Sequence, residues 1–199
     1  MTTKVTTDLI NTLDASKLTG TLPAISGASL TGITTGKVLQ VISVHDATGR
    51  SQSVTSAQRV DISGLSASIT PSATSSKILI SARWNGENGD TNRTWDAVLG
   101  IRRDGTDLGL PSVAGSRSAG MAQVLSNPYQ GNENTSTLEG AMFEYLDSPS
   151  STSSLTYTIT YRTSAGSTFT LYTNRGGSVA DQAYVEYLTS SITLWEIGA

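Results

Sequence analysis

The sequence predicts an all-β protein, an antiparallel β-sandwich preceded by a short N-terminal extension. Segments with alternating apolar and polar residues recur at roughly 8–12-residue spacing, which is typical of sandwiches and jelly rolls. No helical period separates these segments, and only 15% of the 199 residues are charged while Ser, Thr and Gly are abundant. A chain of this length can bury one sizeable core. We therefore divide it into an extension, residues 1–35, and a β domain, residues 36–199.

The first residues carry the pattern of a short amphipathic helix. Leu9, Ile10 and Leu13 are spaced to share one side of a helix, and Thr6 or Thr7 can act as its N-cap. A helix of two or three turns is marginal in isolation. We expect it to order on a partner or in an oligomer, and the alternative is a frayed terminus.

The next segment, residues 14–33, contains the triplet Leu-Thr-Gly twice. A stretch this short and rich in glycine cannot bury its apolar side chains alone, so we expect it to bury them against copies of itself. The apolar residues concerned are Leu18, Leu22, Ile25, Leu30 and Ile33.

The first half of the β domain contains several predicted strands. Residues 37–45 carry β-branched residues at both alternating positions, which predicts a strand that is covered on both faces at its start. In residues 77–84 the alternation places Ile78, Ile80, Ala82 and Trp84 on one core-facing side. Further short strands are expected at residues 58–62 and 65–69.

The second half continues the pattern. Asp104-Gly105 predicts a tight hairpin turn between strands 95–102 and 106–110. The strictest alternation lies in residues 154–162, with Leu155, Tyr157, Ile159 and Tyr161 on one face. Other strands are expected within 115–125 and at 137–146, 168–173 and 190–197. A strand that ends so close to the C-terminus should lie inside a sheet, near the start of the domain or near a symmetry axis.

Catalytic patterns are weak. The single His45 has Ser43 and Asp46 nearby, but adjacent strand residues point to opposite faces, so we expect no Ser-His-Asp site. The carboxylate pairs Glu139 with Glu144 and Asp96 with Asp104 are more simply solvent-facing charges than glycosidase pairs. Without cysteines or a second histidine, no zinc site is expected. We predict a protein that is not an enzyme and has no cofactor.

Composition also argues against several partners. A net charge of -3 provides no basic face for nucleic acid or an anionic membrane. No apolar run is long enough to span a bilayer, and the N-terminus lacks the apolar region of a signal peptide. The oxygen-rich loop 85–92 offers the ligands that calcium prefers but matches no EF-hand spacing, so an ordinary Asn- and Gly-rich loop is the favoured interpretation.

Three long loops, residues 85–92, 126–136 and 174–184, offer recognition chemistry instead. Aromatic faces beside Asn, Asp and Arg can stack on sugar rings and bond their hydroxyl groups. The alternative is that the tryptophans are core residues and the loops are merely solvated. The candidate receptor-binding residues are Trp84, Asp90, Trp95, Tyr129, Arg175 and Tyr184.

The order of several segments resembles tail-fibre-type proteins of bacteriophages, particularly of cyanophages. These segments are LTGTLPAISGASLTGI, GKVLQVISV, VDISGLSASITPSATSSKILI, RRDGT, FEYLDSPSSTSSLTYTITYRT and SSITLWEI, which together span residues 18–197. The resemblance implies a homotrimeric virion protein with a jelly-roll head like those of C1q/TNF-type trimers. It also implies that Leu18, Leu22, Ile25, Leu30 and Ile33 face the trimer axis, and it carries no catalytic motif.

In such a protein the N-terminal helix, with Leu9, Ile10 and Leu13, would attach to the tail or baseplate. The loops of the head would bind a receptor on the host surface, for which a glycan is expected. Two alternatives remain: a capsid decoration or cement trimer without a receptor role, and an enzyme that degrades host glycans.

Overall fold

The computed structural model describes residues 36–55, 58–89, 96–124, 137–164 and 168–198. These residues belong to one compact unit, Thr35–Ala199. The predicted helix at residues 1–13 and the Leu-Thr-Gly segment lie outside the described residues. The strands are β1 (Lys37–Asp46), β2 (Arg50–Val54), β3 (Val60–Ile69), β4 (Lys77–Asn88), β5 (Val98–Arg103), β6 (Thr106–Leu108), β7 (Ala122–Gln123), β8 (Glu139–Asp147), β9 (Leu155–Arg162), β10 (Phe169–Thr173) and β11 (Ser190–Gly198).

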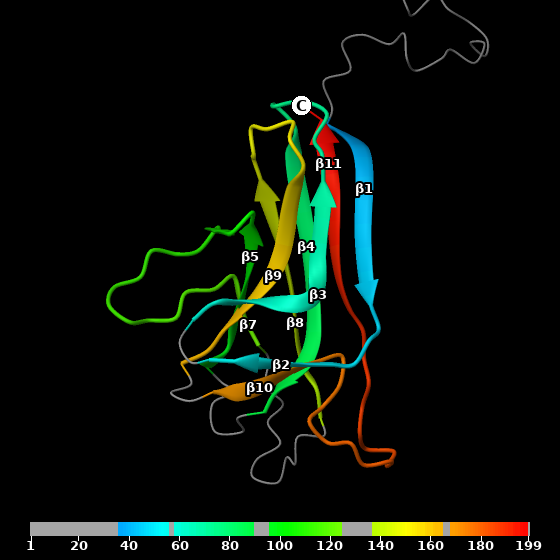
Figure 1. Cartoon of the computed structure of the whole chain (residues 1–199). Helices are drawn as coiled ribbons and strands as arrows, with labels where there is room; N and C mark the ends of the chain where they lie inside the picture. The colour runs from blue at the N-terminus through cyan, green and yellow to red at the C-terminus, as the bar shows by residue number, and fades with distance from the viewer. Residues whose placement is uncertain (1–35, 56–57, 90–95, 125–136, 165–167, 199) are drawn as a thin grey trace, which may run out of the picture. The chain divides into compact units, whose positions relative to one another are not determined.

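All strand pairs are antiparallel, and the strands form two sheets that face each other (Figure 1). Sheet A has the order β1-β11-β4-β10-β2, with β8 on the other edge of β4. Sheet B has the order β3-β9-β5-β6, with β7 also paired to β5. The described chain is therefore an antiparallel all-β sandwich, as the sequence predicts.

The core lies between the sheets and is made by the alternating residues expected from the sequence. Ile78, Ile80, Ala82 and Trp84 of β4 are all buried, and so are the inward residues of β9 from Leu155 to Tyr161. The rings of Trp84 and Tyr161 meet across the sandwich with centroids 5.9 Å apart. The period-2 pattern thus identified the buried face of both central strands.

The C-terminal strand lies inside sheet A, between β1 and β4, which confirms the prediction from its position in the chain. Its register places Leu194 beside Ile42 on one side and Ile80 on the other. The Asp104-Gly105 hairpin is also confirmed, because β5 pairs with β6 across it. Both turn residues have positive φ, 46° and 85°, as a two-residue turn of this kind requires.

Several predicted boundaries are wrong. Residues 58–62 and 65–69 do not form two strands, because β3 continues through Gly64, whose φ of +86° accommodates a shift in register between Asp61 and Ser66. Such an interruption reads as a turn in the sequence. Strand β2 was not predicted, and β4 continues through residues 85–88 of the predicted loop. Of the predicted strand within 115–125, the structure describes residues 115–124, and among these only Ala122–Gln123 forms a strand.

The start of β1 is not covered on both faces as predicted. Val38, Leu39 and Val41 are 57%, 48% and 50% exposed in the single chain. The strand is at the edge of sheet A, and a bulge between Val38 and Gln40 turns Val38 to the same face as Val41. One end of the sandwich holds the start of β1 and the end of β11, and the β10–β11 connection lies at the opposite end (Figure 1).

Candidate functional site

The β10–β11 connection, residues 174–189, is called here the tyrosine loop, and Asn174 fixes its first residue. The Asn174 side chain is fully buried and donates from Nδ2 to the carbonyl oxygens of Asp46, at 2.9 Å, and Thr48, at 3.1 Å. Its Oδ1 accepts a 2.6 Å hydrogen bond from Ser190 Oγ. Asn174 adopts φ 63°, which asparagine tolerates better than most residues. The loop is thus tied to the β1–β2 turn and to β11.

The two ends of the tyrosine loop are also joined to each other. The backbone N–H of Leu188 donates to Asn174 O at 3.1 Å, and Arg175 forms an isolated β-bridge with Tyr187. From below, the buried carboxylate of Glu87 accepts a 3.1 Å hydrogen bond from the backbone N–H of Gly177. A long connection held at both ends and from beneath presents its outer side chains in a defined position.

The guanidinium of Arg175 is turned back onto the loop itself. Its Nε donates to Gly176 O at 2.9 Å, and its Nη2 lies 3.4 Å and 3.5 Å from the carbonyl oxygens of Gly177 and Ser178. It also lies over the Tyr172 ring, 5.3 Å from the centroid. Arg175 was predicted to contact a receptor, but in this structure its charged group holds the loop backbone.

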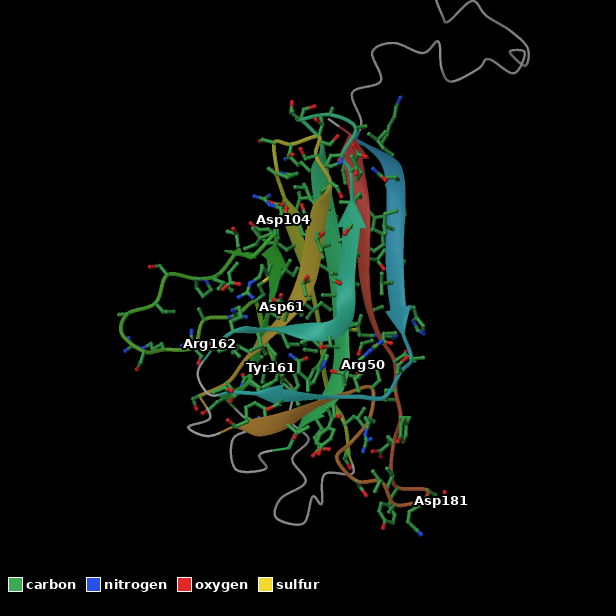
Figure 2. All side chains as sticks on the ribbon, viewed as in Figure 1. Arg50, Asp61, Asp104, Tyr161, Arg162 and Asp181 are labelled. Atoms are coloured by element: carbon green, nitrogen blue, oxygen red, sulfur yellow. The ribbon has the colours of Figure 1, made fainter. Side chains whose placement is uncertain are left out.

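The outer side of the tyrosine loop exposes two tyrosines together with both apolar and polar residues. Tyr184 is 61% exposed, at a turn in which Val185 N donates to Gln182 O at 3.0 Å. Tyr187 is 60% exposed, and one edge of its ring rests against Gly49, where a Cβ would lie 3.1 Å from Tyr187 Cε1. Val179 and Leu188 are exposed as well. Figure 2 shows Asp181 at the outer tip of the same loop.

A second exposed apolar surface lies on the outer face of sheet A, and it is called here the apolar face. The strand register aligns Val41, Trp195, Leu79 and Leu146 in one row across β1, β11, β4 and β8. Val38 and Ile197 pair two positions further along, beside Leu39. Leu146 is 48% exposed, and Met142 of β8 is the most exposed at 77%. The next row on this face, Ser43, Thr193, Ser81 and Glu144, is polar and separates Met142 from Leu146. An exposed apolar row is typical of a surface that another protein covers.

The structure places only two of the six predicted receptor-binding residues on a described surface. Arg175 and Tyr184 lie in the tyrosine loop, whereas Asp90, Trp95 and Tyr129 lie outside the described residues. The interpretation of Trp84 as a receptor contact is wrong, because its side chain is fully buried and its Nε1 donates to Thr173 Oγ1 at 3.1 Å. Alternation in β4 already placed Trp84 with the core residues, and that signal was the correct one.

Tyr187 follows Arg175 and Tyr184 in the sequence pattern that indicates recognition chemistry, although it is not among the six candidates, and the apolar face was not predicted. The apolar residues on both faces of β1 were the available signal for the apolar face, and they predict a strand covered on both faces. The carboxylate pair Glu139 and Glu144 is divided between faces, with Glu139 buried rather than solvent-facing as expected. Among the residues that the structure describes, no group of three His, Asp or Glu side chains could hold a metal ion.

The fold and these surfaces define the class of the protein as an antiparallel β-sandwich with an exposed aromatic loop at one end. Within the described ranges, no helix is long and apolar enough to cross a membrane. No protein-family model matches the chain, and no curated protein matches its sequence.

Proposed function

We propose that this chain is a homotrimeric virion protein, a short tail fibre that attaches to the phage tail or baseplate through residues 1–35. Its β domain, residues 36–199, is a jelly-roll head whose loops bind a glycan on the host surface. Leu9, Ile10 and Leu13 make the virion contact, and Leu18, Leu22, Ile25, Leu30 and Ile33 face the trimer axis. The protein has no catalytic role and no cofactor in this proposal.

The apolar face carries the proposal. Val41 and Leu146 are each about half exposed at the two ends of one cross-strand row, so a single chain leaves a row of four apolar side chains accessible to water. Covering such a row stabilises an assembly by about 25 cal/mol for each Å² of apolar surface removed from water. Two further copies of the chain are the proposed cover.

Strand order supports the jelly-roll description. On the side of sheet A that includes β8, the strand order is β1-β11-β4-β8, because β8 pairs with the edge of β4 opposite β11. The strand order of sheet B is β3-β9-β5-β6. Each sheet therefore interleaves strands from the two halves of the chain, as two Greek keys folded on each other require.

The positions of the chain ends support the assignment of attachment and recognition. The first residue of β1 lies at one end of the sandwich and the tyrosine loop at the other (Figure 1). A head held through the segment before β1 can therefore present the tyrosine loop away from its attachment. Three copies of one weak sugar site would bind with avidity.

The mass of the full-length protein in solution, measured by light scattering, tests the assembly. We expect a trimer for the full chain, and a stable monomer for both the full chain and a shortened chain that starts at Gly36 would overturn the proposal. Antibody labelling of virions then distinguishes the tail from the capsid surface, where the alternative, a decoration or cement protein, would be found. Purified protein should block adsorption of the virus to its host, and it should release no reducing ends from host polysaccharide.

A further inference from the structure

We propose that the tyrosine loop binds uncharged sugar residues, with Tyr184 and Tyr187 as the stacking surfaces and Arg175 as a positioning residue. This inference rests on the proposed function and identifies the surface and the ligand chemistry within it. It departs from the sequence-based expectation that Arg175 contacts the receptor.

The two tyrosines combine exposure with a fixed backbone. Each is about 60% exposed, whereas Asn174, at the start of the loop, is fully buried and fully hydrogen-bonded through its side chain. A tyrosine side chain has only two rotatable bonds, so it gives a large contact surface at a low entropic cost. When the backbone beneath it is ordered before binding, that cost falls further.

The engagement of Arg175 argues against an anionic ligand. Its guanidinium spans the carbonyl oxygens of Gly176, Gly177 and Ser178 and covers Tyr172. A carboxylate or sulfate group would have to displace these interactions before it could form a bidentate pair. Arg175 therefore shapes the loop on which the tyrosines stand.

The remaining charges of the loop also argue against an anionic ligand. Residues 174–189 contain one cation, Arg175, and two carboxylates, Asp181 and Glu186. Beside the loop, Arg83 donates to Thr189 Oγ1 at 2.9 Å and Arg50 is paired with Asp46. The exposed carboxylate of Asp181 can accept hydrogen bonds from sugar hydroxyls and repels acidic sugars, whereas Oε2 of Glu186 is buried.

The test measures binding of the full-length protein to immobilised polysaccharides. The neutral polymers are mannan, dextran and galactan, and the acidic ones are alginate and polygalacturonate. We expect binding to at least one neutral polymer and none to the acidic ones. The affinity should change little between about 0.05 and 0.5 M salt, because no ion pair to the ligand is involved.

Variants connect the binding to the tyrosines. Tyr184→Ala with Tyr187→Ala should weaken binding to the neutral polymer about tenfold or more, because both stacking surfaces are lost. The matched control, Tyr184→Phe with Tyr187→Phe, keeps the ring faces and should bind within about threefold of the original protein. Arg175→Lys keeps the charge but loses the planar fork, so it should weaken binding to the neutral polymer without introducing a salt dependence.

Four results would overturn the inference: preference for an acidic polymer, undiminished binding by the alanine variant, steep loss of affinity with salt, or failure to bind any of the neutral polymers. If the protein still blocks adsorption in that case, the proposed function survives with a different receptor. A monomeric protein that leaves adsorption unchanged would instead remove the proposed function itself.

Discussion

The guanidinium of Arg59 lies over the backbone of Gly100 on the outer face of sheet B. A Cβ at Gly100 would be 2.8 Å from Arg59 Nη1 and 3.2 Å from Thr160 Oγ1. Arg59 donates to Thr160 Oγ1 at 3.0 Å and to Ala119 O, and its Nε lies 3.4 Å from a carboxylate oxygen of Asp107. Its side chain is largely buried. Gly100 therefore leaves the space in which Arg59 joins β9 to the connection between β6 and β7.

This contact predicts that the effect of Gly100→Ala on stability changes sign when Arg59 is replaced, which a double-mutant cycle can measure. Gly100→Ala alone should destabilise the protein by about 1 kcal/mol or more, because the new methyl group displaces a buried arginine from its hydrogen bonds. In an Arg59→Ala background the same change should be neutral or stabilising, since alanine restricts the unfolded chain more than glycine does. Urea unfolding of the four proteins measures both effects, and equal costs in the two backgrounds would show that Arg59 does not occupy this space.

Gly64 should be more sensitive, because both its conformation and its surroundings exclude a side chain. Its φ is +86°, and a Cβ would lie 2.5 Å from Arg50 Nε and 2.7 Å from Asp46 Oδ2. Those two groups form an ion pair at 2.7 Å, in which Asp46 is the buried partner. We expect Gly64→Ala to cost roughly 2–4 kcal/mol of unfolding free energy from backbone strain and a broken ion pair.

Gly115→Ala is the matched control for Gly64→Ala. Gly115 also has positive φ, 67°, but no atom beyond its chain neighbours lies within 4 Å of the place that a Cβ would take. Its replacement should cost only the backbone term, roughly 1 kcal/mol. Thermal unfolding of both variants at one protein concentration gives the comparison, and equal costs would contradict a role for the Asp46–Arg50 pair.

Glu196 should make the protein sensitive to acid. Burial by itself raises the pKa of Glu196, but hydrogen bonds from Ser72, Gln40 and Ser76 outweigh it and lower the pKa to about 2. Its Oε1 accepts from Ser72 N, Ser72 Oγ and Ser76 Oγ at 2.6–2.7 Å, and its Oε2 accepts from Gln40 Nε2 at 2.8 Å. These bonds tie the β3–β4 connection to β11.

Because the folded-state pKa lies below the ordinary value of 4.5, the stabilisation is complete above about pH 4.5. It is lost progressively as the pH falls toward 2. Glu196→Gln should lower stability at pH 7 and flatten the decline between pH 4.5 and 2 relative to the original protein. Denaturant unfolding of both proteins between pH 7 and 2 measures these two differences in stability. Arg50 also lowers the pKa of Asp46, so the difference between the two proteins, not the decline itself, reports on Glu196.

The apolar face should be needed for assembly but not for folding. Val41→Lys with Leu146→Lys places two charges on side chains that are about half exposed in the single chain. We expect the domain to fold, because lysine tolerates an exposed strand position at small cost. The assembly should dissociate to monomers in light scattering, because each charge would have to be desolvated at the interface.

The control for this variant is Ser66→Lys, which adds a charge to an exposed position on the outer face of sheet B. It should leave the mass in solution unchanged. If the double variant remained a trimer with unchanged stability, the apolar face would not be the surface between copies.

Local pattern was sufficient for the class of fold and for the buried faces of β4 and β9, because a period of two residues follows directly from strand geometry. The position of the last strand close to the C-terminus, a separate sequence argument, predicted that it lies inside a sheet. At positions where the sequence offered two interpretations, the tertiary structure decided between them. Gly64 reads as a turn but lies at a shift of register within β3. Alternation placed Trp84 with the core residues while its position beside a loop suggested a receptor contact, and its burial decides for the core.

For the tyrosine loop and the apolar face too, some features follow from the sequence and others only from the tertiary structure. The sequence by itself determined that Tyr184 belongs to a long polar connection and that β1 begins with apolar residues on both faces. Only the tertiary structure decided that Arg175 folds back onto its own loop, since its hydrogen bonds go to carbonyl groups that a flexible chain does not hold in place. Likewise, Val41, Trp195, Leu79 and Leu146 form one row only because strand register brings together four segments distant in sequence.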